Sequence, residues 1–163
     1  MSIELIQAQK TNHDILHRLL ELYCYDFSEI LQTDVDAHGL FHYPYLDLYF
    51  EEENRHPYLV KVEGKYAGFV LINSVLQYLD DPKARAIAEF FILRKYRRKG
   101  VGKEVAFQAF ARFPGKWEVS VLASHTSALT FWKQTIGAYT RDTFEVVDKV
   151  YRGREKQIIL FEQ

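Results

Sequence analysis

The chain contains few of the residues that cross-link or interrupt a fold: its 163 residues include one cysteine, Cys24, one methionine and four prolines. A single cysteine excludes an intramolecular disulfide framework and is typical of a reducing compartment. No apolar stretch approaches the length of a membrane span, and no N-terminal apolar run follows a basic patch as in a signal peptide. These absences predict a cytoplasmic protein that does not bind membranes, with one domain over residues 1–163.

An excess of charge is also lacking, because 21 Lys and Arg oppose 22 Asp and Glu and give a net charge of −1. This balance disfavours nucleic acid as a partner. The distribution is uneven, since residues 1–80 carry −8 and residues 81–163 carry +7. The basic half suits a polyanion and the acidic half suits a cation. Alternatively, the two halves could simply attract each other across the fold.

Hydrophobic periodicity predicts a mixed α/β chain that differs from a doubly wound fold. Glycine and proline mark the ends of most elements. The expected order is a strand at 3–8, helices at 13–31 and 45–53, strands at 57–62, 66–72 and 86–93, a helix at 100–113, a strand at 117–122, a helix from 124–127 to about 135, and strands at 139–147 and 157–161.

The most informative segment is the basic, glycine-containing turn Arg97-Arg98-Lys99-Gly100-Val101-Gly102-Lys103, between an apolar strand and a helix. The first amides of a helix lack intrahelical partners, and the helix dipole makes that end partly positive. Glycines remove Cβ atoms, so an anion can approach the backbone. The turn therefore predicts a phosphate site at a helix N-terminus, although a basic run is also typical of a solvated surface. The spacing fits neither a P-loop nor a dinucleotide fingerprint.

The spacing does fit the pattern Arg/Gln-x-x-Gly-x-Gly/Ala, and residues 57–139 resemble the GNAT superfamily of N-acetyltransferases. The resemblance implies an α/β fold with a splayed, mostly antiparallel sheet flanked by helices. It also implies acetyl-CoA as co-substrate, with pyrophosphate at the turn and pantetheine along the central strand. The cofactor-binding residues that the resemblance implies are Phe90, Phe91, Ile92, Arg97, Arg98, Lys99, Gly100, Val101, Gly102, Lys103, His125 and Trp132.

The second cofactor segment of the superfamily, Asn-x-x-Ala-x-x-x-Tyr, is only partly present at residues 125–132. Ala128 matches, His125 replaces Asn, and Trp132 replaces the Tyr that usually protonates the departing thiolate. An indole cannot supply a proton at neutral pH. His125 could act as the acid instead, or it could cap or hydrogen-bond the next helix. Trp132 could contact pantetheine or pack in the core.

Glu89 is the candidate catalytic residue, since it is the one acid in the otherwise apolar strand at 86–93. A carboxylate in such a run is costly unless it is paired, protonated or used in catalysis. Some members of the superfamily carry a general-base glutamate at the matching position. The alternatives are pairing with Arg85 or Arg94, or exposure at a splayed strand end.

The N-terminal region offers aromatic rings and carboxylates that suit an ammonium group, unless they only belong to two helices packed on the sheet. It predicts a cationic acceptor, either a small-molecule amine or a lysine-like group. Ser120 stands where members that acetylate protein N-termini often carry glutamate, which argues against that class. The pairs His13/His17 and His38/His42 have a spacing that could ligate a metal, but neither has a third ligand, so no metal site is predicted.

The leading hypothesis is therefore an acetyl-CoA-dependent N-acetyltransferase that transfers the acetyl group directly to a primary amine. The alternative is an acyl-CoA-binding or regulatory domain that has lost turnover, and the replacement of Tyr by Trp132 keeps that alternative open. The sequence leaves the oligomeric state open, a dimer included.

Overall fold

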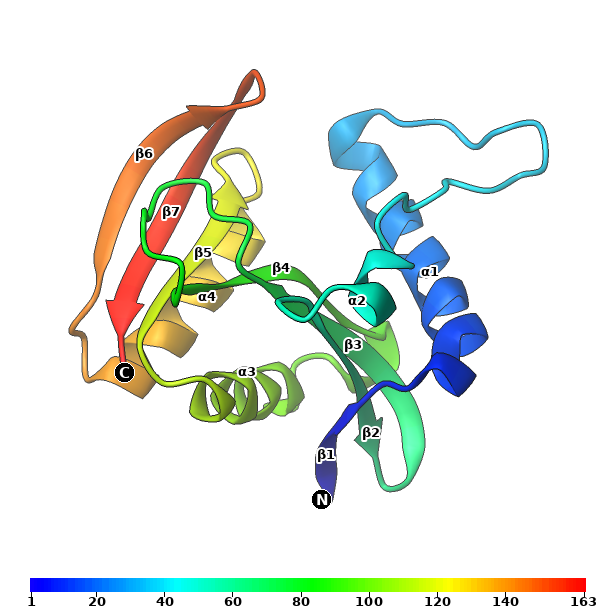
Figure 1. The fold of residues 1–163 in the computed structure, drawn as a ribbon, viewed down its shortest axis with the longest axis horizontal. Coiled ribbons are helices and arrows are strands. Elements are labelled where there is room, and N and C mark those ends of the chain that lie inside the picture. Colours follow the sequence, from blue (N-terminus) through cyan, green and yellow to red (C-terminus); the bar gives the residue numbers. More distant parts are fainter.

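The computed structural model describes residues 1–163 and confirms the expected order of strands and helices (Figure 1). Short 3-10 turns occupy Lys10–Asn12 and Arg94–Tyr96. The elements are β1 (Ile3–Gln7), α1 (His13–Leu31), α2 (Leu48–Glu51), β2 (His56–Val62), β3 (Lys65–Asn73), β4 (Arg85–Ile92), α3 (Val101–Arg112), β5 (Lys116–Leu122), α4 (Thr126–Thr140), β6 (Glu145–Tyr151) and β7 (Arg154–Glu162).

Several boundaries differ from the sequence prediction, and the last two strands, expected at 139–147 and 157–161, run over Glu145–Tyr151 and Arg154–Glu162. The second helix is a single turn rather than the 45–53 segment. The helix α4 continues through Gly137, so Tyr139 lies in this helix and does not begin a strand. The helix ends only at Arg141, which adopts a left-handed conformation. The side chain of Asp142 occupies the space where a Cβ of Gly137 would lie, which explains a glycine inside the helix.

All seven strands form one sheet in the order β1-β2-β3-β4-β5-β7-β6. Every neighbouring pair is antiparallel except β4 and β5, so the mostly antiparallel sheet that the resemblance implied is confirmed. The parallel pair meets only at Arg85–Trp117 and Ala86–Glu118. Beyond Ala86 the two strands separate, and this edge of β4 has no strand partner.

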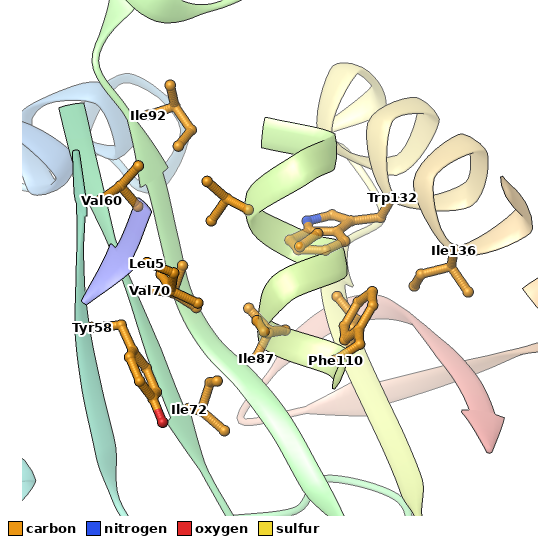
Figure 2. Packing of buried hydrophobic residues seen from close by; sticks show 14 of the residues in the cluster. Leu5, Tyr58, Val60, Val70, Ile72, Ile87, Ile92, Phe110, Trp132 and Ile136 are labelled. Carbon is orange, nitrogen blue, oxygen red and sulfur yellow. The ribbon is translucent and has the colours of Figure 1, made fainter. Parts of the chain in front are cut away.

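Helices cover both faces of the sheet (Figure 1). The helix α1 buries Leu16 and Leu20 in a cluster with Phe69 and Leu71 of β3. On the opposite face, α3 and α4 pack in the larger core, where Figure 2 shows Phe110, Trp132 and Ile136 beside strand residues such as Ile87. Each helix therefore buries one apolar face against the sheet.

A close backbone contact fixes β3 against the C-terminal end of β4, the part of β4 that no longer pairs with β5. Gly68 pairs with Ile92, and a Cβ atom built on Gly68 would lie 1.9 Å from the carbonyl oxygen of Phe91. Backbone atoms in the middle of a sheet cannot move aside as a flexible side chain can. Gly68 is therefore required for the register of β4.

We expect Gly68→Ala to lower the free energy of unfolding by roughly 1–3 kcal/mol, because even one methyl group overpacks this contact. Urea unfolding followed by circular dichroism measures the change. Gly39→Ala is a suitable control, since Gly39 is in the left-handed region at φ 76° but has no atom within 4 Å of the added Cβ, so that variant measures backbone strain without a clash. Equal losses in the two variants would contradict the packing argument.

Candidate active site

A cavity of about 650 Å³ lies where β4 and β5 separate. Its walls come from α1, the 43–49 segment, β4, β5, the start of α4 and the β6–β7 hairpin. Among the predicted site residues, the structure brings four together at this cavity: Glu89, Phe90, His125 and Trp132. The basic turn at residues 97–103 lies outside its walls.

Glu89 lies at a β-bulge in β4, which directs its side chain toward the cavity. Leu71 pairs with Glu89 and Ile72 pairs with Ile87, so Ala88 is the extra residue. The hydroxyl of Tyr23 in α1 donates a hydrogen bond to Oε2 of Glu89. Neither arginine considered from the sequence is a partner of this carboxyl group. Glu89 is thus not held in an ion pair with Arg85 or Arg94, and its catalytic role stays a prediction.

Burial raises the pKa of Glu89 to about 7, and hydrogen bonding from Tyr23, the charge of Lys156 and the Tyr43 hydroxyl oppose this rise. The pKa of Tyr23 and that of Tyr43 are raised, mainly by burial, so both hydroxyls remain protonated donors. A carboxyl group that titrates near neutral pH, held by fixed donors, is suited to general-base catalysis.

Lys156 lies on the opposite wall, on β7, and its pKa is lowered by burial, an effect that the charge of Glu89 partly offsets. The sequence analysis missed this residue. Its neighbours Arg152 and Arg154 also line the cavity. A signal was present, because basic residues at alternate positions of a strand share one face.

Glu118 is a second missed residue, with an exposed fraction of only 1%. Its carboxylate accepts hydrogen bonds from the backbone amides of Gln77, Tyr78 and Leu79, at 2.7, 3.2 and 2.9 Å. The segment between β3 and β4 is thereby fixed over β5. Ser120 extends this contact by donating a 2.7 Å hydrogen bond to Oε1 of Gln77. No local pattern reveals Glu118, because its partners are about 40 residues away in the sequence.

The start of α4 closes one end of the cavity. His125 is the N-cap residue, but its side chain makes no capping hydrogen bond, and its ring packs edge-on against Phe27, with ring centroids 5.5 Å apart. Burial lowers the pKa of His125. Trp132 is 6% exposed and packs against Phe90, with ring centroids 4.8 Å apart. Trp132 is thus a core residue that also lines the cavity. The structure is therefore compatible both with packing in the core and with contact to pantetheine.

The turn after β4 presents a row of unpaired amides. The backbone amides of residues 98–103 donate no hydrogen bond within the protein. Gly100 allows this geometry, because it precedes α3 with φ 81° and a Cβ there would meet no atom within 4 Å. Six free amides at the start of a helix form an anion site. The exposed cations Arg98, Lys99 and Lys103 lie along the same segment.

Arg97 differs from the other basic residues of this turn. Its backbone amide donates to the carbonyl of Arg94, and its guanidinium bonds to the carbonyl of Ile92 at 2.7 Å and to Oδ2 of Asp26 at 2.6 Å. Arg94 binds the other oxygen of Asp26 at 2.9 Å. The predicted anion contact by Arg97 is therefore not available in this arrangement, and Arg97 instead fixes the turn to α1.

The role expected for Gly102 also needs correction. A Cβ atom on Gly102 would lie 3.0 Å from the ring of Phe131, so the glycine accommodates this ring rather than an approaching anion. Phe91 and Ile92 are buried in the clusters on opposite faces of the sheet, and Val101 is fully buried. Only backbone groups of these residues could contact a cofactor.

None of the carboxylates of the N-terminal region lines the cavity, and three of them bind elsewhere in the protein. Besides the contact of Asp26 with the basic turn, Asp36 accepts amides of its own loop and Asp47 bonds to His13 at 2.9 Å. Tyr23, Tyr43 and Tyr45 do line the cavity. The aromatic part of the predicted acceptor region is therefore at the site and the acidic part is not.

A comparison with protein-family models matches residues 16–138 to the acetyltransferase (GNAT) family. The chain belongs to the GNAT acetyltransferase family. The match begins well before residue 57, so it also includes α1, which the resemblance in the sequence did not reach.

Solved structures of GNAT acetyltransferases share the fold. Aminoglycoside acetyltransferase AAC(6')-Ib bound to coenzyme A has 14% sequence identity and a TM-score of 0.71, covering 99% of this chain and 95% of that one. An acetyltransferase from Thermus thermophilus has 15% identity and a TM-score of 0.72, covering 100% and 98%. A Bacillus subtilis acetyltransferase bound to coenzyme A has 15% identity and a TM-score of 0.63, covering 99% of each chain.

Other comparisons and searches of the structure give negative findings. Curated protein sequences contain no match to the chain. No helix of this GNAT protein is both long and apolar enough to cross a membrane. No three or more His, Cys, Asp or Glu side chains are grouped so that they could hold a metal ion.

We expect the double variant Arg98→Gln/Lys99→Gln to bind coenzyme A roughly 3- to 30-fold more weakly, because two exposed cations beside the free amides are lost. Its affinity should also fall less steeply with salt than that of the wild type. Calorimetry with coenzyme A and with pantetheine, which lacks the phosphates, measures both. Lys116→Gln is the control, an exposed lysine at the far end of β5. Equal weakening for pantetheine would contradict a phosphate site.

We expect Trp132→Phe to lower the free energy of unfolding by roughly 1–3 kcal/mol while the pH profile of turnover keeps its shape. The reason is that the indole packs against Phe90 and cannot donate a proton to a thiolate. Trp132→Tyr should equal or exceed wild-type turnover, since it adds a hydroxyl donor. Loss of turnover in Trp132→Phe with unchanged folding and coenzyme A affinity would contradict this assignment.

Proposed function

We propose that this protein is an acetyl-CoA-dependent N-acetyltransferase that transfers the acetyl group directly to a primary amine of a small-molecule or lysine-like acceptor. The observation that carries the proposal is Glu89, a carboxyl group with a pKa of about 7 inside the cavity where β4 and β5 separate. Family membership and the free amides of residues 98–103 support it.

The residues present fit coenzyme A. The free amides at the start of α3 would hold the pyrophosphate, and the unpaired edge of β4 near Phe90 would bind the pantetheine arm through its backbone. The fold is shared with AAC(6')-Ib, which was solved in complex with coenzyme A, and this likeness supports coenzyme A as the ligand. The bound thioester supplies an acetyl carbon that is open to nucleophilic attack.

Glu89 would act as the general base, directly or through a water molecule. An amine is protonated at neutral pH and attacks only after it has lost that proton to solvent. As the new N–C bond forms, the attacking nitrogen gives a second proton to the ionised Glu89, and the C–S bond then breaks. The hydrogen bond from Tyr23 keeps the carboxyl group oriented in both protonation states.

The departing sulfur would leave toward the start of α4. Trp132 has no proton to give, but the amides of Thr126, Ser127 and Ala128 donate no hydrogen bond within the protein. Free amides and the helix dipole stabilise negative charge at this position. His125 or water would then supply the proton for the thiolate.

Direct transfer is favoured over an acyl-enzyme, because Cys24 is the one thiol of the chain. It lines the cavity, but burial raises the pKa of Cys24 to about 11, with Glu21 and Glu89 adding to the rise. A thiol with this pKa is largely protonated at neutral pH and is a poor nucleophile.

The second candidate is an acyl-CoA-binding or regulatory domain without turnover, which Trp132 at the usual acid position favours. Thiol release from acetyl-CoA in the presence of an amine library separates the two. Release that depends on an amine, with the acetylated amine found by mass spectrometry, supports the enzyme. Coenzyme A binding without any release supports the domain without turnover.

We expect Glu89→Gln to lower turnover roughly 100-fold or more with little change in coenzyme A affinity, because the amide keeps the shape but cannot accept the proton. Wild-type kcat/KM should rise as the pH passes 7 and then level off, since the base must be ionised. The variant should lose this step.

The unfolding free energy of Glu89→Gln at pH 8 should equal or exceed that of the wild type, because a carboxyl group with a raised pKa destabilises the fold once it ionises.

Cys24→Ala is the matched control within the same cavity, and it should keep wild-type turnover and sequential kinetics. Full activity of Glu89→Gln at neutral pH would exclude Glu89 as the base. Ping-pong kinetics that disappear in Cys24→Ala would contradict direct transfer.

A further inference from the structure

The acceptor side of the cavity carries an unusual concentration of cations. Arg152 and Arg154 flank Gly153 at the tip of the β6–β7 hairpin, and Lys156 follows on β7. Arg154 and Lys156 are two residues apart in a strand, so they point to the same face, and the intervening Glu155 points to the other. All three cations line the cavity.

These three cations have no acidic partner in the protein. No carboxylate lies within 4.0 Å of any of them, whereas Arg55, the fourth cation of the cavity, pairs with Glu52 at 2.7 Å. Cations that line a cavity without a partner are available to bind an anion from solution.

The acids that face this region are few. Glu89 and Glu118 are the only acidic residues that line the cavity. The carboxylate of Glu118 already accepts three backbone amides. One free carboxyl group, Glu89, therefore faces three unpaired cations, so the local field opposes the entry of a polycation.

Aromatic rings contact two of the three cations. The guanidinium of Arg152 lies 5.3 Å from the ring centroid of Tyr151, and Nζ of Lys156 lies 5.8 Å from the same centroid. The Tyr45 hydroxyl beside Arg152 raises the pKa of that guanidinium and connects the hairpin tip to the segment before α2. Arg152, Arg154 and Lys156 are called the basic wall below. Contacts from Tyr151 and Tyr45 thus position two members of this basic wall, Arg152 and Lys156.

We propose that the acceptor is a primary amine that also carries an anionic group, a carboxylate or a phosphate, which Arg154 and Lys156 bind while the amine faces Glu89. This proposal rests on the proposed function and names its substrate class. It differs from the polycationic aminoglycosides that are bound in structures of AAC(6')-Ib, such as kanamycin and ribostamycin.

Matched pairs of amines test the proposal, because each pair differs only in the anionic group. The pairs are 4-aminobutyrate with 4-aminobutanamide, and 2-aminoethyl phosphate with ethanolamine, and kanamycin serves as the polycation. We expect kcat/KM to be at least tenfold higher for the anionic member of one pair or both, and the pair with the larger ratio identifies carboxylate or phosphate. Equal or higher values for the neutral members or for kanamycin would overturn the proposal.

Variants of the basic wall locate the effect. Arg154→Gln should raise the KM for the anionic amine roughly tenfold with little change in its kcat or in the KM for acetyl-CoA. Arg154→Glu should reverse the preference within each pair. Lys116→Gln, at the other end of β5, should change none of these values. A rise in the KM for acetyl-CoA instead would show that these cations bind the phosphates of coenzyme A, and it would overturn the proposal.

The amine assays also distinguish failure of this proposal from failure of the proposed function. Acetylation confined to neutral or cationic amines would leave the enzyme activity in place and overturn only the inference. If no amine were acetylated, the proposed function would fail. Calorimetry of 4-aminobutyrate and 4-aminobutanamide with the coenzyme A-bound protein would then decide the inference, since only the anionic probe should bind, and Arg154→Gln should remove that binding.

Discussion

The separation of β4 from β5 after only two paired positions is the constraint on which the rest of the site depends. A parallel pair continued to the strand ends would fill the cavity with backbone and leave no open edge. The separation persists because contacts on either side hold the two strands independently. Arg97 fixes the end of β4 to α1 through Asp26, and Glu118 fixes β5 to the segment after β3. Both contacts use charge-assisted hydrogen bonds, which are stronger than neutral ones.

The cavity between the separated strands β4 and β5 explains why the carboxyl group of Glu89 can be kept in an apolar strand. Burial disfavours the charged form of Glu89, and the hydroxyls of Tyr23 and Tyr43 together with the charge of Lys156 do not fully offset this cost, so the pKa of Glu89 rises to about 7. Additional donors or an arginine partner would lower the pKa and remove the basicity at neutral pH. Arg94 supplies no such charge, because it pairs with Asp26 and does not line the cavity.

Local patterns in the sequence predicted the elements and the residues whose role depends on a single strand or turn. Periodicity was sufficient for the order of helices and strands, and Glu89 stood out within an apolar run. Contacts between distant segments could not be predicted in this way. Gly102 was expected to face an anion and instead faces Phe131, which is one turn into another helix. The role of Glu118 became visible only when the fold placed β5 beside the segment between β3 and β4, because no spacing rule connects residues so far apart. For Lys156, the alternation of basic residues indicated a shared face but not that this face lines the cavity.

The distribution of charge along the sequence also predicted the site only in part. The acidic N-terminal half suggested a cation-binding acceptor region, but its carboxylates act in local caps and in the contact with the basic turn. The basic C-terminal half suggested a polyanion site, and it supplies two separate groups of cations, one at residues 98–103 and one on the β6–β7 hairpin. The second group lines the cavity and the first lies outside its walls, and Glu89 is the one carboxyl group of the cavity that accepts no backbone amide. Under the proposed function, the first group would attract the phosphates of the donor, the second would favour an acceptor with its own negative charge, and Glu89 would provide the local site for the ammonium group.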